Sequence, residues 1–153
     1  MTTVTLDEIK SAHAAVANLI AQYEAQAKEQ EAILFPESLI KLSPGEHYAG
    51  LIVGKDGNLS YHLILMAGEA ESINWKDAQA WAKGQSGELP NRREQALLFA
   101  NLKEQFQPRY YWSSEQHASA SDCAWIQHFD DGGLYYHLTD YQLRARAVRR
   151  LPI

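Results

Sequence analysis

The side chains best suited to metal chemistry are His128 and His137. Both fall on short strand-like runs joined by a tight turn, and Asp130 and Asp131 lie in that turn. Two imidazoles with one carboxylate form a ligand set that suits a transition metal. The same histidines also alternate with apolar residues, which is typical of the exposed side of a hairpin. We favour the exposed hairpin, expect no metal or cofactor, and keep a metal-dependent enzyme as the weaker alternative.

Cys123 is a second candidate for chemistry, because a thiolate is a strong nucleophile. It is the only cysteine, so the chain has no partner thiol for a disulfide or for a metal site of several cysteines. Asp122 beside it should raise the pKa of the thiol and disfavour the thiolate. We therefore expect Cys123 to pack in the interior and the protein not to be an enzyme.

The N-terminal segment, residues 5–34, is expected to form one long helix. Thr5 and Glu8 have the spacing of a capping box, and no Gly or Pro interrupts the chain before Pro36. Apolar or near-apolar residues recur at alternating steps of four and three, which is the heptad pattern of a coiled coil. They are Ile9, His13, Val16, Ile20, Tyr23 and Ala27. Such a helix can pack on its own domain, but we favour self-association into a homo-oligomer.

The middle of the chain predicts a hairpin and two shorter helices. Residues 47–53 and 60–66 flank a Gly-Lys-Asp-Gly-Asn turn, which favours a hairpin. Residues 75–83 favour a helix that Asn74 can cap, and Asn91 begins another with a capping-box spacing. The buried side of this last helix is expected at Ala96, Leu97, Ala100 and Leu102.

Several short strands follow, and they settle the fold class. Strand-like runs cover residues 110–112, 124–129, 134–138 and 143–148. In the last run, alternation places Ala145 and Ala147 inside and Arg144 and Arg146 outside. A helix, a hairpin, two helices and then antiparallel strands indicate an α+β fold and not a βαβ repeat. We expect an N-terminal arm over residues 1–35 and one domain over residues 36–153.

Sequence pieces between residues 74 and 150 have a distinctive order. They are Trp75-Lys76-Asp77-Ala78, Leu89-Pro90-Asn91-Arg92-Arg93-Glu94, Tyr111-Trp112-Ser113-Ser114, Ala124-Trp125 with Phe129 and Gly132, and Val148-Arg149. In this order they resemble the Lcl carboxy-terminal-domain-like family, found in phage and prophage proteins and bacterial surface adhesins. The resemblance implies a C-type-lectin-like fold, a mostly antiparallel sheet flanked by two helices. We interpret Trp75, Trp112 and Trp125 as core residues of that scaffold.

The chain departs from the resemblance in ways that bear on activity. Many members carry a cysteine near the final arginine, and here Arg146-Ala147-Val148-Arg149 has none. Calcium-binding lectins use Glu-Pro-Asn followed by Trp-Asn-Asp, whereas Glu88-Leu89-Pro90-Asn91 has an inserted residue and no Trp-Asn-Asp occurs. Calcium needs about six to eight oxygen ligands, which this sequence does not assemble. Oxygenating enzymes of the same fold that use paired thiols need two cysteines. Neither a calcium lectin nor an oxidase is favoured.

Recognition is then expected to lie on loops. The segment from Glu115 to Asp122 is rich in Ser and Ala, and the segment from Asp130 to Tyr136 brings tyrosines, which are favoured at interfaces. The candidate binding residues are Glu115, Gln116, His117, Asp122, Asp130, Asp131, Tyr135, Tyr136 and Tyr141. We predict a non-catalytic recognition protein, encoded by a phage or prophage, with a protein or surface glycan as partner. A phage-encoded inhibitor of a host protein is the alternative.

Charge and composition narrow the setting. The net charge is −5, which does not favour nucleic-acid binding. The arginines of residues 141–153 fit a solvated strand face better than a site for an anionic partner. No apolar run has the length of a membrane span, and the N-terminus does not resemble a signal peptide. With one cysteine, we expect the host cytoplasm or a virion.

Overall fold

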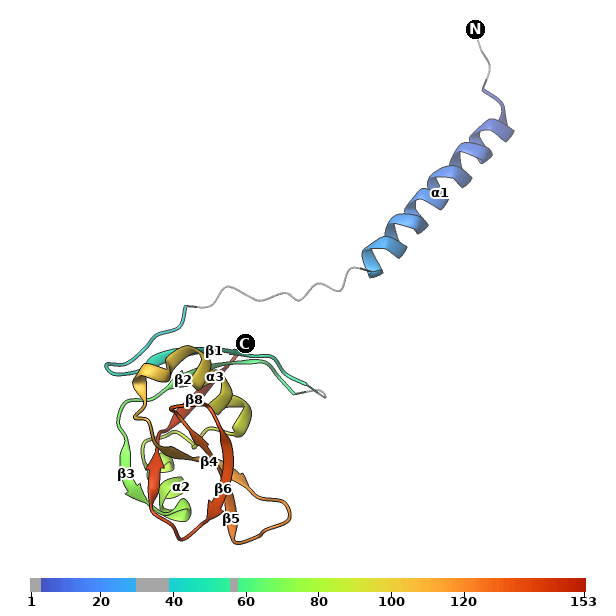
Figure 1. Ribbon diagram of the computed structural model, residues 1–153. Coiled ribbons are helices and arrows are strands. Elements are labelled where there is room, and N and C mark those ends of the chain that lie inside the picture. The colour runs from blue at the N-terminus through green and yellow to red at the C-terminus, as the bar shows by residue number, and fades with distance from the viewer. Residues whose placement is uncertain (1–3, 30–38, 56–57) are drawn as a thin grey trace. The chain divides into compact units, whose positions relative to one another are not determined.

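The computed structural model describes residues 4–29, 39–55 and 58–153 (Figure 1). The chain divides into two compact units, Met1–Pro36 and Glu37–Ile153. Within the described residues, none of the helices combines the length and the apolar character that crossing a bilayer requires.

The first unit contains helix α1, Leu6–Glu29. The predicted capping box is confirmed, because Glu8 Oε2 accepts from the Thr5 backbone N–H at 2.8 Å and the Glu8 N–H donates to Thr5 Oγ1 at 3.3 Å. The seam residues from Ile9 to Tyr23 all lie in this helix with exposed side chains. Ala27 lies in the helix, but its side chain and residues 30–34 of the expected helix fall outside the described residues.

The second unit is a mixed α+β structure with two sheets that are mostly antiparallel. The predicted α+β class is therefore confirmed. The smaller sheet has the order β1-β2-β8, with β1 (His47–Ile52), β2 (Tyr61–Leu65) and β8 (Val148–Pro152). The larger sheet has the order β3-β7-β4-β5-β6, with β3 (Ala70–Ile73), β7 (Leu143–Ala145), β4 (Tyr110–Gln116), β5 (Cys123–His128) and β6 (Leu134–Leu138). Only β4 and β7 run parallel among these strands.

The hairpin and both short helices are confirmed. Strands β1 and β2 pair antiparallel. The Asn74 side chain caps α2, Trp75–Gly84, and Asn91 forms a capping box with Glu94 at α3, Arg92–Leu102, which the short 3-10 helix η1, Lys103–Gln105, extends. Helix α3 lies along β1, and α2 lies beside β3 and β4 (Figure 1).

The predicted buried side of α3 is wrong except at Leu102. Ala96 and Ala100 are exposed and Leu97 is half-buried. The buried residues are instead Glu94, Gln95, Leu98 and Leu102. Two polar side chains can occupy this side because their hydrogen-bonding groups find internal partners, such as the Tyr111 carbonyl for Gln95 Nε2 at 3.1 Å.

Two apolar clusters form the core of the second unit. One joins the smaller sheet and α3 to Phe106, Tyr111 and Phe129, where the rings of Phe106 and Phe129 stack with centroids 3.8 Å apart. The other joins α2 to β4 and β5 around Trp112, which is fully buried and donates from Nε1 to the Ile73 carbonyl at 2.9 Å. Trp75 packs against this second cluster, so the core role expected of Trp75 and Trp112 is confirmed.

The C-terminal segment differs from its prediction. The strand expected over residues 143–148 is divided between β7 and β8, which belong to different sheets. Ala145 and Ala147 are buried as expected, but Arg146 is buried too, with 8% of its surface exposed. Its guanidinium donates to the Gln105 and Met66 carbonyls, at 2.6 and 3.0 Å. The chain between the two strands therefore turns the arginine inward, which strict alternation does not anticipate.

Candidate functional site

The predicted binding residues are distributed over two strands, the connections beside them and the segment after β6. Glu115 and Gln116 end strand β4 and are not part of a loop, whereas residues 117–122 connect β4 to β5. Asp130 and Asp131 occupy the turn before β6, which carries Tyr135 and Tyr136. Tyr141 follows β6 and stacks on His137, with ring centroids 4.2 Å apart. The structure therefore brings only some of these residues together.

Two of the predicted residues, His117 and Tyr136, gather with Arg92 and Trp125, and we call these four residues the aromatic platform. The His117 ring lies 4.3 Å from the Tyr136 ring and 4.9 Å from the Trp125 ring, centroid to centroid. Trp125 and Tyr136 meet edge to face at 5.7 Å. The Arg92 guanidinium carbon sits 4.4 Å from the Trp125 ring centre, in cation–π geometry. Tyr136 remains 53% exposed and the other three are half-buried, so the platform is packed and still open to solvent.

Trp125 corrects a sequence expectation. It was expected in the core, but it lies on the opposite face of β5 from the buried Ala124 and Ile126. Its neighbours across the sheet are Tyr136 on β6 and the side chain of His117. An apolar indole in this position contributes area to a surface and not to the interior.

Glu115 fixes the arginine of the platform. Its Oε2 accepts from the Arg92 backbone N–H at 2.6 Å and from Arg92 Nε at 3.1 Å, and its Oε1 accepts from Nη2 at 3.2 Å. Partial burial alone raises the pKa of Glu115, but the hydrogen bonds from Arg92 outweigh it and hold the pKa below its ordinary value. A charged, two-pronged contact of this kind holds the guanidinium plane in one orientation.

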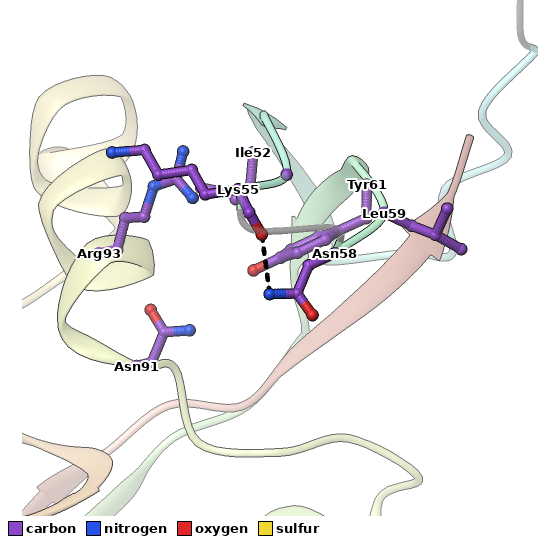
Figure 2. A pocket seen from close by; sticks show the side chains of 8 residues that line it. Ile52, Lys55, Asn58, Leu59, Tyr61, Asn91 and Arg93 are labelled. Carbon is purple, nitrogen blue, oxygen red and sulfur yellow. Dashed lines mark hydrogen bonds between the residues drawn. The ribbon is translucent and has the colours of Figure 1, made fainter.

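Two hollows flank the start of α3. The larger, about 600 Å³, is lined by Ile52, Gly54, Lys55, Asn58, Leu59, Tyr61, Asn91 and Arg93. Figure 2 shows Asn91 and Arg93 on the α3 side, facing Lys55 and Asn58 on the hairpin. The smaller, about 480 Å³, is lined by Asn91, Arg92, Arg93 and Glu115, so it joins the first hollow to the aromatic platform.

The larger hollow carries positive charge. Arg93 Nη2 donates to the Val53 carbonyl at 2.7 Å, and neither Arg93 nor Lys55 forms an ion pair with a carboxylate of the described residues. The Tyr61 hydroxyl in its wall is already engaged, donating to Glu94 at 2.7 Å. This hollow therefore favours an acidic group over a basic one.

The larger hollow was not predicted from the sequence. Its walls come from the hairpin and from the start of α3, and the nearest lining residues of the two, Tyr61 and Asn91, are 30 residues apart in the chain. The one available signal was the Asn91-Arg92-Arg93 run, where two cations follow a helix cap.

Three of the C-terminal arginines, Arg144, Arg149 and Arg150, form ion pairs within the protein, so the expected solvated strand face is wrong for them. Arg144 Nη1 lies 2.7 Å from Glu69 Oε1, and Arg149 Nε lies 2.7 Å from Glu46 Oε1. The contact from Arg149 lowers the pKa of Glu46 to about 2.

Arg150 makes the most buried of these pairs. Its Nε lies 2.5 Å from Glu94 Oε1, its Nη2 lies 2.9 Å from Glu94 Oε2, and it also contacts Glu88. Glu94 is fully buried. Its two oxygens are nevertheless provided with partners, because Arg150 and the Tyr61 hydroxyl both donate to it.

The histidine pair is not assembled into a metal site. In the β5–β6 ladder His137 lies opposite Ala124, four residues along the strand from His128, which is about 13 Å. His128 Nδ1 lies 3.4 Å from Asp131 Oδ1, and its ring packs on Tyr110. In the part of the chain that the structure describes, no three His, Cys, Asp or Glu side chains gather as metal ligands.

Cys123 is buried, as expected. Burial, and then the neighbouring Asp122 carboxylate, raise the pKa of its thiol. Such a thiol stays protonated near neutral pH and is a poor nucleophile.

A scan of the chain against protein-family models finds no matching family. A search of curated proteins finds no match either.

Proposed function

We propose that the protein is a non-catalytic recognition protein that binds its partner through the aromatic platform and the hollows beside it. The observation that carries the proposal is the packing of Trp125, Tyr136 and His117 with Arg92 in a cluster still open to solvent, with Glu115 holding the arginine. Trp, Tyr and Arg dominate the energetic centres of protein interfaces. Trp and Tyr bury much area with few freely rotating bonds, and here Glu115 restrains the arginine. A platform already packed in the free protein loses little further freedom on binding.

The positive charge beside the aromatic platform indicates which chemical groups the partner presents. Lys55 and Arg93 line the hollow next to the platform and have no carboxylate partner among the described residues. A partner that fits both parts presents an apolar or ring-bearing surface beside an acidic group. We propose a protein or a surface glycan of that chemistry.

The proposed scaffold is a C-type-lectin-like domain of the Lcl carboxy-terminal-domain-like family, encoded by a phage or prophage. The positions of the resembling sequence pieces support it. Trp75 Nε1 donates to the Ser113 carbonyl at 2.7 Å, so two of these pieces are in direct contact. Leu89 is buried against the cluster that holds Trp112. These pieces thus contribute to the apolar cluster between α2 and the larger, mostly antiparallel sheet.

The proposal includes self-association through α1. Ile9, Val16, Ile20 and Tyr23 keep their apolar side chains exposed within the described part of their own unit. A helix of 24 residues with a heptad seam gains most of its stability by packing that seam against another helix. Joined copies would bind a repetitive surface with higher avidity than single ones. Full-length protein with Ile9→Glu and Ile20→Glu should sediment as a smaller species; an unchanged mass rejects this role.

The recognition surface is tested with variants of the platform. Wild-type protein, Trp125→Ala and His117→Ala are compared in binding to host lysate fractions and to cell-surface polysaccharide, with the affinity measured for each bound component. We expect both variants to lose affinity by roughly tenfold or more. Tyr48→Ala is the matched control, because Tyr48 is an exposed tyrosine of β1 outside the platform.

The outcome that contradicts the proposal is a partner bound equally well by wild type and by both platform variants. The location of the native protein distinguishes a virion component from an inhibitor of a host protein. Recovery with purified virions favours a particle component, and recovery from the soluble part of infected cells favours an inhibitor of a host protein.

A further inference from the structure

Strand β6 is the bare edge of the larger sheet. It is the last strand of the order β3-β7-β4-β5-β6, and among the described residues β5 is its only pairing partner. Its sequence Leu134-Tyr135-Tyr136-His137-Leu138 contains no acid, lysine, arginine, proline or glycine. Four of its five side chains are exposed and apolar or aromatic. An uncharged, exposed edge strand of this kind is a template for another strand.

The other edges of the two sheets each carry a feature that blocks strand addition. On β1, the register shifts at Gly50, and Asn101 Nδ2 donates to the Ala49 carbonyl at 2.7 Å. On β8, Glu88 pairs with Val148 through two backbone hydrogen bonds, at 2.8 and 2.9 Å. On β3, the pairing with β7 is irregular and Glu71 is exposed. Charges, bulges and covering segments are the usual protections of sheet edges, and within the described part of the chain β6 shows none of them.

The ladder shows which backbone groups of β6 point outward. The Thr139 N–H donates to the Asp122 carbonyl and the His128 N–H donates to the Gly133 carbonyl, each at 2.8 Å. Because hydrogen-bonded pairs alternate along an antiparallel ladder, the backbone groups of Tyr135 and His137 point inward to β5. Those of Leu134, Tyr136 and Leu138 therefore point away from the sheet.

We propose that β6 pairs with β6 of a second copy, antiparallel and centred on Tyr136. In that register Tyr136 lies opposite itself, Tyr135 lies opposite His137, and Leu134 lies opposite Leu138. The three outward residues of each copy then meet the three of the other, which forms about six backbone hydrogen bonds. The Leu138 carbonyl already accepts from the Tyr141 N–H at 3.1 Å, and its second lone pair remains for the new strand.

The side-chain pairs in this register favour a second copy over an unrelated peptide. The strand reads nearly the same in both directions, so its two-fold pairing brings leucine to leucine and aromatic ring to aromatic ring. Tyr–His contacts of the same type already occur within this sheet, between Tyr110 and His128 with centroids 4.4 Å apart. No like charges meet across the two-fold axis, and cross-strand pairs of this composition stabilise sheets.

The pairing also joins two recognition surfaces. Tyr136 belongs to the aromatic platform, and in a hydrogen-bonded antiparallel pair the two central Cα atoms lie about 5.5 Å apart. The platforms of both copies would form one continuous surface across the joined sheet. The pairing itself does not rest on the proposed function, since it follows from the edge strand alone.

The test is hydrogen exchange of single amides in the full-length chain with Ile9→Glu and Ile20→Glu, which removes the helix seam. We expect the Leu134, Tyr136 and Leu138 amides to exchange more slowly as the protein concentration rises. The Tyr135 and His137 amides, bonded to β5, serve as internal controls and should be slow at every concentration. Sedimentation of the same samples measures the self-association constant.

Two variants block the edge. Tyr136→Lys brings a charge from each copy to the central pair and should weaken self-association by roughly tenfold or more. Tyr136→Pro removes an outward N–H without removing a bond to β5, and should have the same effect. Ser72→Lys, on the opposite edge strand β3, is the matched control and should associate like the parent.

The self-pairing is overturned if the three outward amides exchange equally fast at all concentrations, or if Tyr136→Lys and Ser72→Lys associate alike. It is also overturned if these amides gain protection only when a different polypeptide is added. In that case the edge accepts a foreign strand and not a second copy. None of these results depends on whether the aromatic platform binds a partner.

Discussion

Two arginine–glutamate pairs at the start of α3 have nearly the same chemistry and opposite surroundings. Glu94 receives Arg150 in the interior, with none of the glutamate surface exposed. Arg92 receives Glu115 at the surface, with side-chain exposures of 40% and 35%. The buried pair joins α3 to the C-terminal strand β8, and the surface pair orients a guanidinium under Trp125. The same kind of ion pair thus contributes to stability in the interior and to a binding surface at the exterior.

Breaking the buried pair should have the largest effect on stability. Glu94→Gln leaves the Arg150 guanidinium without its main countercharge and weakens the capping box of α3. We expect the free energy of unfolding to fall by about 3–5 kcal/mol, measured by urea denaturation. Glu88→Gln is the control, because Glu88 also contacts Arg150 but is exposed. Equal losses in the two variants would show that burial does not separate the two kinds of pair.

The Arg149–Glu46 pair is less buried than the Arg150–Glu94 pair and more buried than the Arg92–Glu115 pair. Its contribution to stability can be measured as a function of pH. The hydrogen bond from Arg149 lowers the pKa of Glu46 to about 2 from an ordinary value of 4.5. A depressed folded-state pKa adds stability above the unfolded pKa, and that contribution is lost as the pH falls from about 4.5 towards 2.

Glu46→Gln should therefore be less stable than wild type at pH 7 and should show a shallower decline in acid. Water around Arg149 screens the pair, so we expect a difference of only about 1–2 kcal/mol at neutral pH. Urea denaturation of both proteins between pH 7 and pH 3 measures it. Parallel pH profiles would exclude Glu46 as a source of acid sensitivity.

Breaking the surface pair should affect stability least. Glu115→Gln should change the free energy of unfolding by less than about 1 kcal/mol, since both side chains remain solvated. Freed from its carboxylate, Arg92 should leave the Trp125 ring, which changes the tryptophan fluorescence and weakens partner binding. A variant with wild-type binding and fluorescence would show that Glu115 does not position the arginine.

Local signals predicted much of the secondary structure. Both capping boxes, the Asn74 cap and the hairpin were read correctly, because each depends on residues a few positions apart. Strand β3 was missed, since its four residues include Glu71 and Ser72, and no periodicity marks it. The position of Arg146 was wrong because alternation ends where the chain passes between two sheets.

The candidate site was predicted only in part for the same physical reason. His117 and Tyr136 were among the expected binding residues, because loops and tyrosines are enriched at interfaces. Trp125 was expected in the core and Arg92 was not among the expected binding residues, since their contact joins α3 to β5 across 33 residues of sequence. Contacts over such separations depend on the packed fold, and single-sequence patterns carry little information about them.

The bare edge of β6 has a consequence for how far assembly can grow. If the seam of α1 forms one self-contact and β6 forms another, each chain has two sites through which it can bind further copies. If both contacts close on the same pair of copies, assembly stops at a dimer. If they engage different copies, dimers link end to end into open polymers, whose length rises with concentration and whose solutions become viscous. A single lysine on β6 would then act as a chain terminator.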